Sequence, residues 1–309
     1  MNNETIFELA IIGGGPAGCA ATVYAARKKI KTLLCTYDFF GQSSVSDDIQ
    51  NWIGTNHISG NDLSKSLEKH VREYEGDDLF IHTKVYIVSI EKDGGLYIIK
   101  DSKNNIFKSK TILICSGSKR RKLEIKGADV FEHKGLTYCA TCDGPLFTGT
   151  DVCVIGAGNA AFESALQLSK YCKSVTILAR SATYKADQVT VEKVLKTTNI
   201  NIINSVNMLE VVGDKMVKGI IINDGSGEKT LDVEGIFVEI GQIPNTDYIN
   251  IVDKNAFGNI KVDPRTQVTS DSHIWAAGDC TDGLYHQNNI AVGDAIKAVE
   301  DLFIHLHNL

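Results

Sequence analysis

The sequence predicts an α/β fold with two dinucleotide-binding units in tandem. A glycine-rich turn at residues 13–18 stands between a strand-like and a helix-like segment, and a second turn at 156–161 repeats the arrangement. The turns begin 156 − 13 = 143 residues apart, and 309 residues are enough for two domains that each bury a core. Strand, glycine turn and helix in this order are typical of Rossmann-like domains, which bind a pyrophosphate at the turn.

The first unit opens with a buried parallel strand, a helix and a second strand. We expect these elements at residues 6–12, 16–29 and 31–36, respectively. Between the first strand and the helix, Gly13, Gly15 and Gly18 would let the backbone approach a pyrophosphate at the N-terminus of the helix.

The end of the second strand lacks an acidic residue. An Asp or Glu at this position would bind the ribose of the adenosine, but the sequence has Thr36 there and Asp38 two positions later. The residue that contacts the ribose is therefore not identified by the motif.

The remainder of the first half predicts a loop, a helix and a meander of short strands. The loop-like segment 39–60 contains Gly41-Gln42 and Asn51-Trp52. Helical spacing is found at 61–74, and strands are expected at 80–91, 96–100 and 110–115.

The second unit repeats the order of the first. A strand at 151–155, a helix at 162–171 and a strand at 174–179 are expected. The turn between the first strand and the helix contains Gly156, Gly158 and Ala161. Alanine is permitted at the third position, because helix-to-strand packing there requires only a small residue.

Basic residues follow the second strand of this unit. An NAD site would have Asp or Glu there, whereas the sequence has Arg180, with Lys185 shortly after. Arginine favours the 2′-phosphate of NADP, so the pattern indicates NADP(H). The alternative is that Arg180 and Lys185 are an ordinary pair of solvated surface cations.

The C-terminal part predicts further strands and one long helix. Strands and hairpins are expected within 201–224 and 228–239, a short strand at 272–277 and a helix at 289–307. The short strand leads to Gly278-Asp279, which would put a carboxylate at the carboxyl end of a parallel sheet, where ligands bind. A Gly-Asp pair is also common in plain turns.

Composition and charge argue against two classes of partner. The chain is 43% hydrophobic and 23% charged, as in soluble globular proteins, and its formal net charge is -6. This charge gives no reason to expect nucleic acid or an anionic membrane as a partner. No segment approaches the ~18 apolar residues of a membrane span.

The cysteines and the N-terminus predict a cytoplasmic protein. Met1–Glu4 lacks the basic region of a signal peptide, and the apolar run at 9–12 is too short for its hydrophobic region. Six of the eight cysteines stand singly among apolar or small residues, and we expect them to be buried and reduced: Cys19, Cys35, Cys115, Cys153, Cys172 and Cys280.

The other two cysteines form a Cys-x-x-Cys motif, Cys139 to Cys142, shortly before the second glycine turn. Two close thiols can bind a metal, form a structural bridge or carry electrons. Zinc would need two more ligands, and His133 is the one histidine nearby, so we expect no metal. Asp143 either opens an Asp-Gly-Pro turn or acts as acid and base in thiol exchange.

These motifs together resemble those of the low-molecular-weight thioredoxin reductase family, over the whole chain. The matching segments are GGGPAG (13–18), GQ (41–42), NW (51–52), CATCDG (139–144), GAGNAA (156–161), IGQIPNT (240–246), AAGDC (276–280) and HQ (286–287). The segments TCDGPLF, KADQVTVEKVL and AAGDCT are also similar to the flavoprotein subunit of alkyl hydroperoxide reductase.

The resemblance implies a flavin disulfide reductase in which one domain is inserted into the other. The FAD-binding domain would comprise residues 1–117 and 245–309, and the NAD(P)-binding domain, with the Cys-x-x-Cys motif, residues 118–244. The residues implied to lie around FAD are Gly13, Gly15, Gly18, Gln42, Asn51, Asp279 and Gln287. Those implied for NAD(P) are Gly156, Gly158, Ala161, Arg180 and Lys185.

The resemblance also implies roles for the redox residues. Cys142 would be nearest the flavin, Cys139 would attack the substrate disulfide, and Asp143 would be the acid and base. Electrons would pass from NADPH to a thioredoxin or a thioredoxin-like protein, and the enzyme would be a homodimer.

The sequence departs from the family pattern at two places. The family's basic cluster HRR-x-x-x-R corresponds to residues 179–185, where Arg180 and Lys185 alone are basic. The electron source could therefore also be NADH or a protein donor such as ferredoxin. The electrons could also go to a peroxiredoxin system that is served through a separate carrier. His286 and Asn288 flank Gln287 where the family has Arg and Ala, which would alter the flavin potential.

Overall fold

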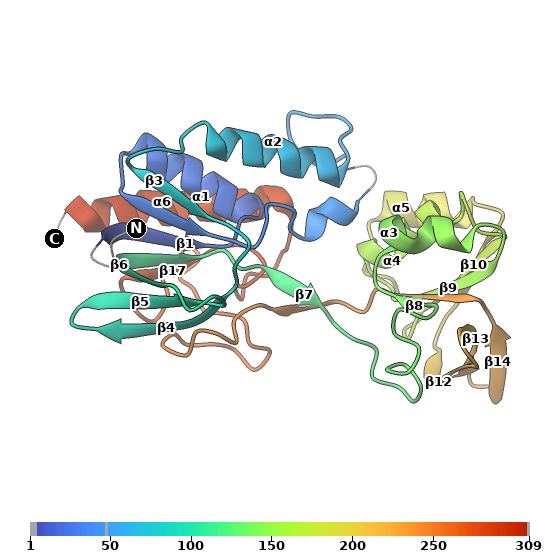
Figure 1. Ribbon diagram of the computed structural model, residues 1–309. Helices are drawn as coiled ribbons and strands as arrows, with labels where there is room; N and C mark the ends of the chain where they lie inside the picture. Colours follow the sequence, from blue (N-terminus) through green and yellow to red (C-terminus); the bar gives the residue numbers. More distant parts are fainter. Residues whose placement is uncertain (1–4, 47–48, 308–309) are drawn as a thin grey trace. The chain divides into compact units, whose positions relative to one another are not determined.

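The computed structural model describes residues 5–46 and 49–307. Residues 1–4, on which the signal-peptide prediction rests in part, lie outside the described residues. The chain divides into two compact units. The first comprises the described residues up to Lys119 and from Ile243 onwards, and the second is Arg120–Gln242. The first unit is therefore built from two separate segments of chain, which Figure 1 shows in blue to green and in orange to red.

A seven-stranded sheet forms the centre of the first unit. Its order is β3-β2-β1-β6-β5-β4, and β17 also pairs with β6. The strands are β1 (Ile6–Ile12), β2 (Thr32–Cys35), β3 (Leu79–His82), β4 (Ile87–Asp93), β5 (Leu96–Asp101), β6 (Ile106–Ile114) and β17 (Ile274–Ala276). The first half of β6 pairs antiparallel with β5, and its second half pairs parallel with β17. One long strand thus joins a meander to a parallel sheet.

Both faces of this sheet are buried. Leu9 and Ile11 of β1 belong to one apolar cluster, and Ala10 and Ile12 belong to the cluster on the other face. The helices α1 (Pro16–Arg27), α2 (Gly60–Arg72) and α6 (Asn288–His307) contribute to the first cluster and lie on one side of the sheet in Figure 1. Burial on both faces explains the continuous apolar run of β1.

The second unit has a five-stranded parallel sheet in the order β11-β10-β9-β15-β8. Its strands are β8 (Leu136–Thr137), β9 (Asp151–Ile155), β10 (Ser174–Leu178), β11 (Ile200–Ile203) and β15 (Gly235–Val238). An antiparallel sheet is formed by β12 (Asn207–Gly213), β13 (Val217–Asn223) and β14 (Glu228–Asp232). The helices are α3 (Ala140–Asp143), α4 (Asn159–Leu168) and α5 (Gln188–Leu195), with the 3-10 turn η2 (Gly144–Phe147) after α3.

The chain passes from one unit to the other at two short strands. These are β7 (Ser118–Arg120) and β16 (Gln242–Pro244), which pair as a two-stranded sheet. Within the described part of the chain, each hydrophobic core cluster is confined to one of the two units.

The predicted α/β fold and the elements around both glycine turns are confirmed, with ends shifted by at most three residues. The prediction of one strand at 80–91 is wrong, because β3 ends at His82 and β4 begins at Ile87. Lys84, between them, has a φ of 61°, which an extended strand does not accommodate.

Three elements of the second unit are not predicted from the sequence: β8, α3 and α5. The segment of α5, QVTVEKVL, is rich in β-branched residues and lacks a long helical repeat. It is helical because Val191 and Val194, three positions apart, are both buried against the sheet. Tertiary packing therefore overrides local propensity here.

All six single cysteines are buried and free, as predicted. Among the residues that the structure describes, none of the helices combines the length and the apolar character needed to cross a membrane.

Candidate functional site

A cleft opens in the first unit where the parallel strands end. Its volume is about 680 Å³, and residues that follow β1, β2, β6 and β17 line it. Of the predicted residues, Gly13, Gly15, Gln42 and Asp279 line this cleft. It lies at the carboxyl ends of the strands, which is where open α/β sheets bind ligands.

The glycine turn of the first unit permits a close approach to α1. Gly15 is the N-cap of α1, with Pro16 in the first helical turn. Gly18 lies behind the turn, and a Cβ atom on it would stand 1.8 Å from the carbonyl oxygen of Gly13. The free N–H groups at the start of α1 therefore border the cleft and can bind a phosphate group.

The polar residues predicted for this site fall into two groups. In the cleft, Gln42 donates from Nε2 to the carbonyl of Ser118 at 2.9 Å. Burial raises the pKa of Asp279, while the charge of His286 and a hydrogen bond from Ser118 act in the opposite direction. Asn51 and Gln287 do not line the cleft.

Asn51 and Gln287 instead contact each other, although they are 236 positions apart. Asn51 Nδ2 donates to Gln287 Oε1 at 3.0 Å, and Asn289 Nδ2 donates to the Asn51 carbonyl at 2.6 Å. Ser43 donates to Asn288 at 2.6 Å. These bonds tie the loop after β2 to the start of α6, next to the cleft.

The position of the missing acidic residue is occupied by a packed threonine. Thr36 is buried, and its hydroxyl donates to the Asp38 carbonyl at 2.6 Å. Beside it, the rings of Tyr37 and Tyr86 stack with centroids 4.6 Å apart and an interplanar angle of 11°. Both tyrosines line the cleft and are exposed, and Lys84 Nζ lies 5.1 Å from the Tyr37 ring centroid. The sequence alone does not indicate this pair.

The second glycine turn has the same construction. Gly156 has a φ of 153°, and a Cβ on it would lie 2.3 Å from the Glu239 carbonyl oxygen. Gly158 is the N-cap of α4, and Ala161 is fully buried behind the turn. A side chain at Gly156 would therefore displace the end of β15, and the start of α4 is left open for a phosphate group.

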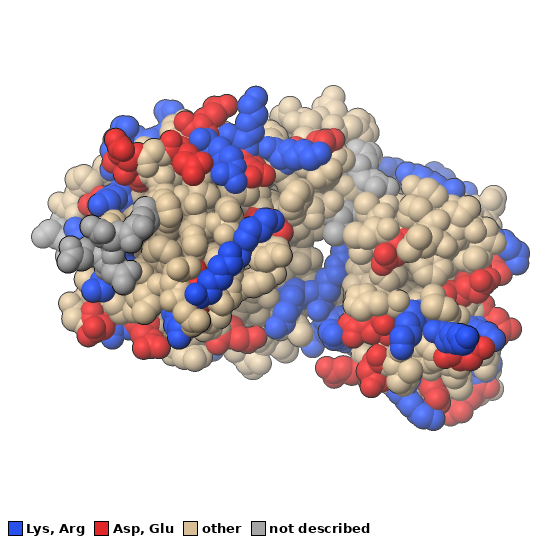
Figure 2. Space-filling view, viewed as in Figure 1, with Lys and Arg blue, Asp and Glu red and all other residues tan. Residues whose placement is uncertain are grey.

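The two predicted cations lie on a loop that is anchored beside this turn. Lys185 donates from its backbone to the Ala157 carbonyl at 2.8 Å, and Asp187 donates from its backbone to Asn159 Oδ1 at 2.6 Å. Arg180 and Lys185 are exposed, and neither forms an ion pair with any residue that the structure describes. Charges of both signs are interspersed on the face shown in Figure 2.

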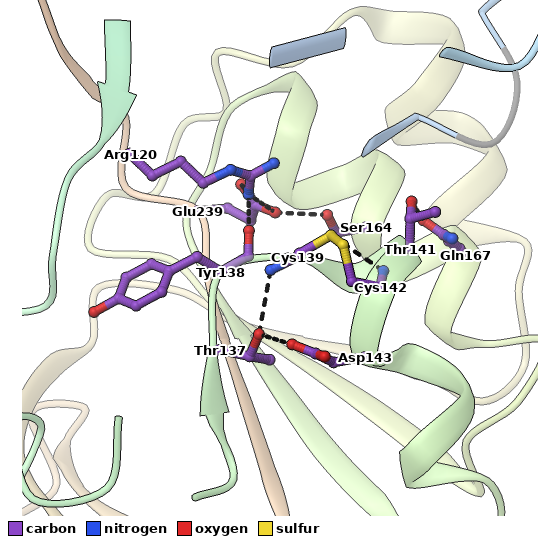
Figure 3. A network of polar contacts seen from close by, with 10 residues as sticks. All are labelled: Arg120, Thr137, Tyr138, Cys139, Thr141, Cys142, Asp143, Ser164, Gln167 and Glu239. Carbon is purple, nitrogen blue, oxygen red and sulfur yellow. Dashed lines mark hydrogen bonds and ion pairs between the residues drawn. A yellow bond between two sulfur atoms is a disulfide. The ribbon is translucent and has the colours of Figure 1, made fainter. Parts of the chain in front are cut away.

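The two cysteines of the Cys-x-x-Cys motif form a disulfide, with their Cα atoms 5.3 Å apart. Cys139 is the N-cap of α3, and the backbone N–H of Cys142 donates to Cys139 Sγ at 3.1 Å. Cys139 is half-buried and Cys142 is exposed. Asp143 accepts a hydrogen bond from the Thr137 hydroxyl, and Thr137 also accepts one from the Cys139 backbone at 3.4 Å (Figure 3).

A largely buried ion pair borders the disulfide on the side opposite Asp143 (Figure 3). Arg120 Nη1 lies 2.8 Å from both carboxylate oxygens of Glu239 and also donates to the Tyr138 carbonyl. Ser164, on α4, donates to Glu239 at 2.9 Å. Burial raises the pKa of Glu239, whereas Arg120 and Ser164 act to lower it. Sequence reasoning missed this pair because no local motif connects residues 119 positions apart.

The structure therefore brings the predicted residues together in two groups. Gly13, Gly15, Gln42 and Asp279 line a cleft in the first unit. The disulfide, the second glycine turn and the two cations belong to the second unit. A disulfide can accept and release two electrons by thiol exchange, and this one shares its unit with a nucleotide-type turn.

Comparisons with known proteins identify a matching family and similar structures. The family model "Pyridine nucleotide-disulphide oxidoreductase" matches residues 7–295. A thioredoxin reductase from T. acidophilum superposes with a TM-score of 0.92 at 33% identity, covering 98% of this chain and 100% of that one. A thioredoxin reductase from Lactococcus lactis also has a TM-score of 0.92, at 30% identity, covering 98% of this chain and 100% of that one.

Two curated relatives are longer than this chain. The F subunit of alkyl hydroperoxide reductase in Escherichia coli is 37% identical over an alignment of 310 positions, which covers 99% of this chain and 59% of that protein. A protein named NADH dehydrogenase, from Bacillus subtilis, is 36% identical over 303 residues, which is 97% of this chain and 58% of that protein. The chain thus spans less than two thirds of the length of either relative.

Proposed function

The chain belongs to the pyridine nucleotide-disulphide oxidoreductase family, and we propose that it is a thioredoxin-disulfide reductase. Electrons would pass from NADPH through FAD and the Cys139–Cys142 disulfide to a thioredoxin-like protein. The observation that carries this proposal is the disulfide itself, which is accessible at Cys142 and belongs to the same unit as the second glycine turn.

The cleft of the first unit fits FAD. The start of α1 offers free N–H groups for a pyrophosphate, and Asp279 and Gln42 supply polar groups further along. The stacked Tyr37 and Tyr86 provide an aromatic surface for the adenine. When bound, FAD accepts a hydride from a nicotinamide and passes two electrons to a disulfide.

The loop after β10 favours NADPH as the donor. Arg180 and Lys185 are exposed cations beside the glycine turn, and a 2′-phosphate would give each of them a charge-assisted partner. NADH is the second candidate, because the name of the Bacillus subtilis relative contains that nucleotide. Ferredoxin is a third candidate, because the loop has fewer cations for a nucleotide phosphate than the family's basic cluster.

Cys139 is proposed as the nucleophile toward the partner. The Cys142 N–H at Cys139 Sγ stabilises negative charge there, as a helix N-cap does. In the dithiol form, the Cys139 thiolate attacks the partner's disulfide and displaces one of its sulfurs, which takes up a proton. Cys142 then attacks Cys139, restores the disulfide and releases the second sulfur of the partner. Asp143, which accepts a hydrogen bond from the Thr137 hydroxyl, is proposed to supply and accept these protons.

The greater exposure of Cys142 argues for the opposite assignment. Accessibility alone does not make a nucleophile, since the thiolate and not the thiol reacts. We therefore assign the attack to Cys139 and the return step to Cys142.

The partner is proposed to be a thioredoxin-like protein. The likeness to the F subunit of alkyl hydroperoxide reductase favours, as a second candidate, a peroxiredoxin system that is served through a separate carrier. A homodimer in the cytoplasm completes the proposal and stays a prediction from the sequence resemblance.

The donor is tested by stopped-flow reduction of the FAD-loaded protein with NADPH, NADH and reduced ferredoxin in parallel. We expect NADPH to be preferred and Arg180→Ala with Lys185→Ala to raise its KM roughly tenfold or more, with little effect on NADH. Lys215→Ala, an exposed lysine at the β12–β13 turn, is the matched control. Failure of both nicotinamides to reduce the flavin would overturn the proposal.

The disulfide is tested by replacing each cysteine with serine. Flavin reduction by the nucleotide should persist in Cys139→Ser and Cys142→Ser, while reduction of a thioredoxin disulfide is lost. Cys142→Ser should also accumulate a mixed disulfide between Cys139 and the partner, because the return step is blocked. Unchanged thioredoxin reduction by either variant would remove the pair from the mechanism.

A further inference from the structure

The Arg120–Glu239 ion pair lies at the base of the redox motif. Arg120 is the last residue of β7, and Glu239 directly follows β15. The side chains of Arg120 and Glu239 are 21% and 6% exposed, respectively, so water screens neither charge well. A buried pair of this kind costs desolvation energy and is weak support for stability on its own.

The pair is close to Cys139 through one peptide group. Arg120 donates to the Tyr138 carbonyl, and this peptide continues into Cys139 (Figure 3). Standard bond lengths then place the guanidinium within roughly 9 Å of Cys139 Sγ. At this distance, and with an effective dielectric constant of about 20, a unit charge shifts a thiol pKa by about one to one and a half units.

Several other charged groups face the same region. Asp143 on α3 is bound to Thr137, Glu163 lies on α4, and Asp187 precedes α5. Burial and the neighbouring Asp187 and Glu239 raise the pKa of Glu163. Arg120 is the one cation in contact with Glu239 among the described residues, so its charge opposes those of the carboxylates.

We propose that Arg120 and Glu239 act as an opposed pair of positioning residues that set the acidity of the Cys139 thiol. The cation stabilises the thiolate, and the carboxylate limits this effect and holds the cation against the Tyr138 carbonyl. This proposal shares one assumption with the proposed function, namely that the Cys139–Cys142 pair is redox-active.

The test measures the pKa of Cys139 directly in the protein without partner or nucleotide. In a Cys142→Ser background, Cys139 is kept reduced with dithiothreitol, the reagent is removed, and alkylation by iodoacetamide is followed from pH 5 to pH 10. Mass spectrometry of the peptide that contains Cys139 distinguishes it from the six buried cysteines.

The two single variants should move this pKa in opposite directions. Glu239→Gln leaves the cation uncompensated and should lower the pKa of Cys139 by about one unit. Arg120→Met should raise it, because the cation is lost whether or not Glu239 then takes up a proton. The pKa of the double variant should lie between those of wild type and Arg120→Met, because the cation is nearer to Cys139 than the carboxylate that limits it. Arg120→Lys, which keeps the charge, should preserve the wild-type pKa.

The pair Lys218–Asp214, 2.7 Å apart with side chains 68% and 65% exposed, supplies the matched controls Lys218→Met and Asp214→Asn, which should have no effect. A merely structural role would shift both single variants in the same direction and make the double variant the most altered. That result, or shifts no larger than those of the controls, would overturn the proposal. The two proposals can fail separately. If the single variants shift the pKa of Cys139 in opposite directions but the protein does not pass electrons from nucleotide to thioredoxin, this proposal stands and the proposed function is rejected.

Discussion

Three carboxylates that are wholly or partly buried differ in pKa because they differ in hydrogen-bond donors. Asp101 accepts bonds from Asn105, Lys103 and His82, at distances of 2.7–2.8 Å. Burial would raise its pKa, but these donors lower it to about 2. Glu239 and Asp279 have fewer donors, and burial raises their pKa values. The count of donors to the charged form therefore decides the direction of the shift.

The low pKa of Asp101 predicts a pH dependence of stability. The folded-state value lies below the unfolded one, so the unfolded chain takes up this proton first as pH falls. The stabilisation is complete above about pH 4 and is lost between about pH 4 and pH 2. We expect wild type to lose about 2 kcal/mol more than Asp101→Asn across this window, measured by urea unfolding.

The control for this comparison is Asp93→Asn, an exposed residue of the β4–β5 hairpin. Its pH profile should match that of wild type. If Asp101→Asn also matches wild type from pH 5 to pH 2, the donors around Asp101 do not stabilise its charged form.

At the scale of elements, the end of β2 and the start of β4 build one end of the cleft. Tyr37 follows β2, Tyr86 precedes β4, and their rings stack. Stacking of a base on an aromatic side chain contributes about 1–3 kcal/mol. Tyr86→Ala should therefore weaken FAD binding roughly tenfold to a hundredfold and leave FMN, which lacks the adenosine, unaffected.

Fluorescence titration of the apoprotein with FAD and with FMN measures this difference. Phe257→Ala replaces another exposed aromatic residue of the first unit, which does not line the cleft, and should change neither affinity. Equal losses for FAD and FMN in Tyr86→Ala would show that the tyrosine supports the loop and does not contact the adenine.

At the scale of the whole molecule, the two units have separate hydrophobic cores. The clusters that contain Leu9 and Ala10 belong to the first unit, and those that contain Cys153 and Val154 belong to the second. Chains of this kind commonly unfold in more than one step. A ligand stabilises the unit that binds it, by about 2.7 kcal/mol at a hundredfold excess over its Kd.

We therefore expect two transitions in calorimetry of the apoprotein. FAD should raise the midpoint of one transition, and NADPH should raise the midpoint of the other. A single transition that both ligands shift equally would show that the units unfold together.

The sequence by itself determined the α/β class, both glycine turns and the position of the Cys-x-x-Cys motif. These features follow from local rules, since Gly18 and Gly156 have no room for a side chain and the order of strand, turn and helix is continuous in the chain. The strand and helix ends near the turns were predictable for the same reason.

Only the tertiary structure decided which distant residues meet. Asn51 and Gln287 are 236 positions apart, and Arg120 and Glu239 are 119 apart, yet each pair is in hydrogen-bond contact. Tyr37 and Tyr86 come together because the first sheet aligns the ends of separate strands, and α5 is helical because its valines are buried. Such contacts depend on the packing of whole sheets and helices, and the spacing of residues along the chain carries no local signal for them.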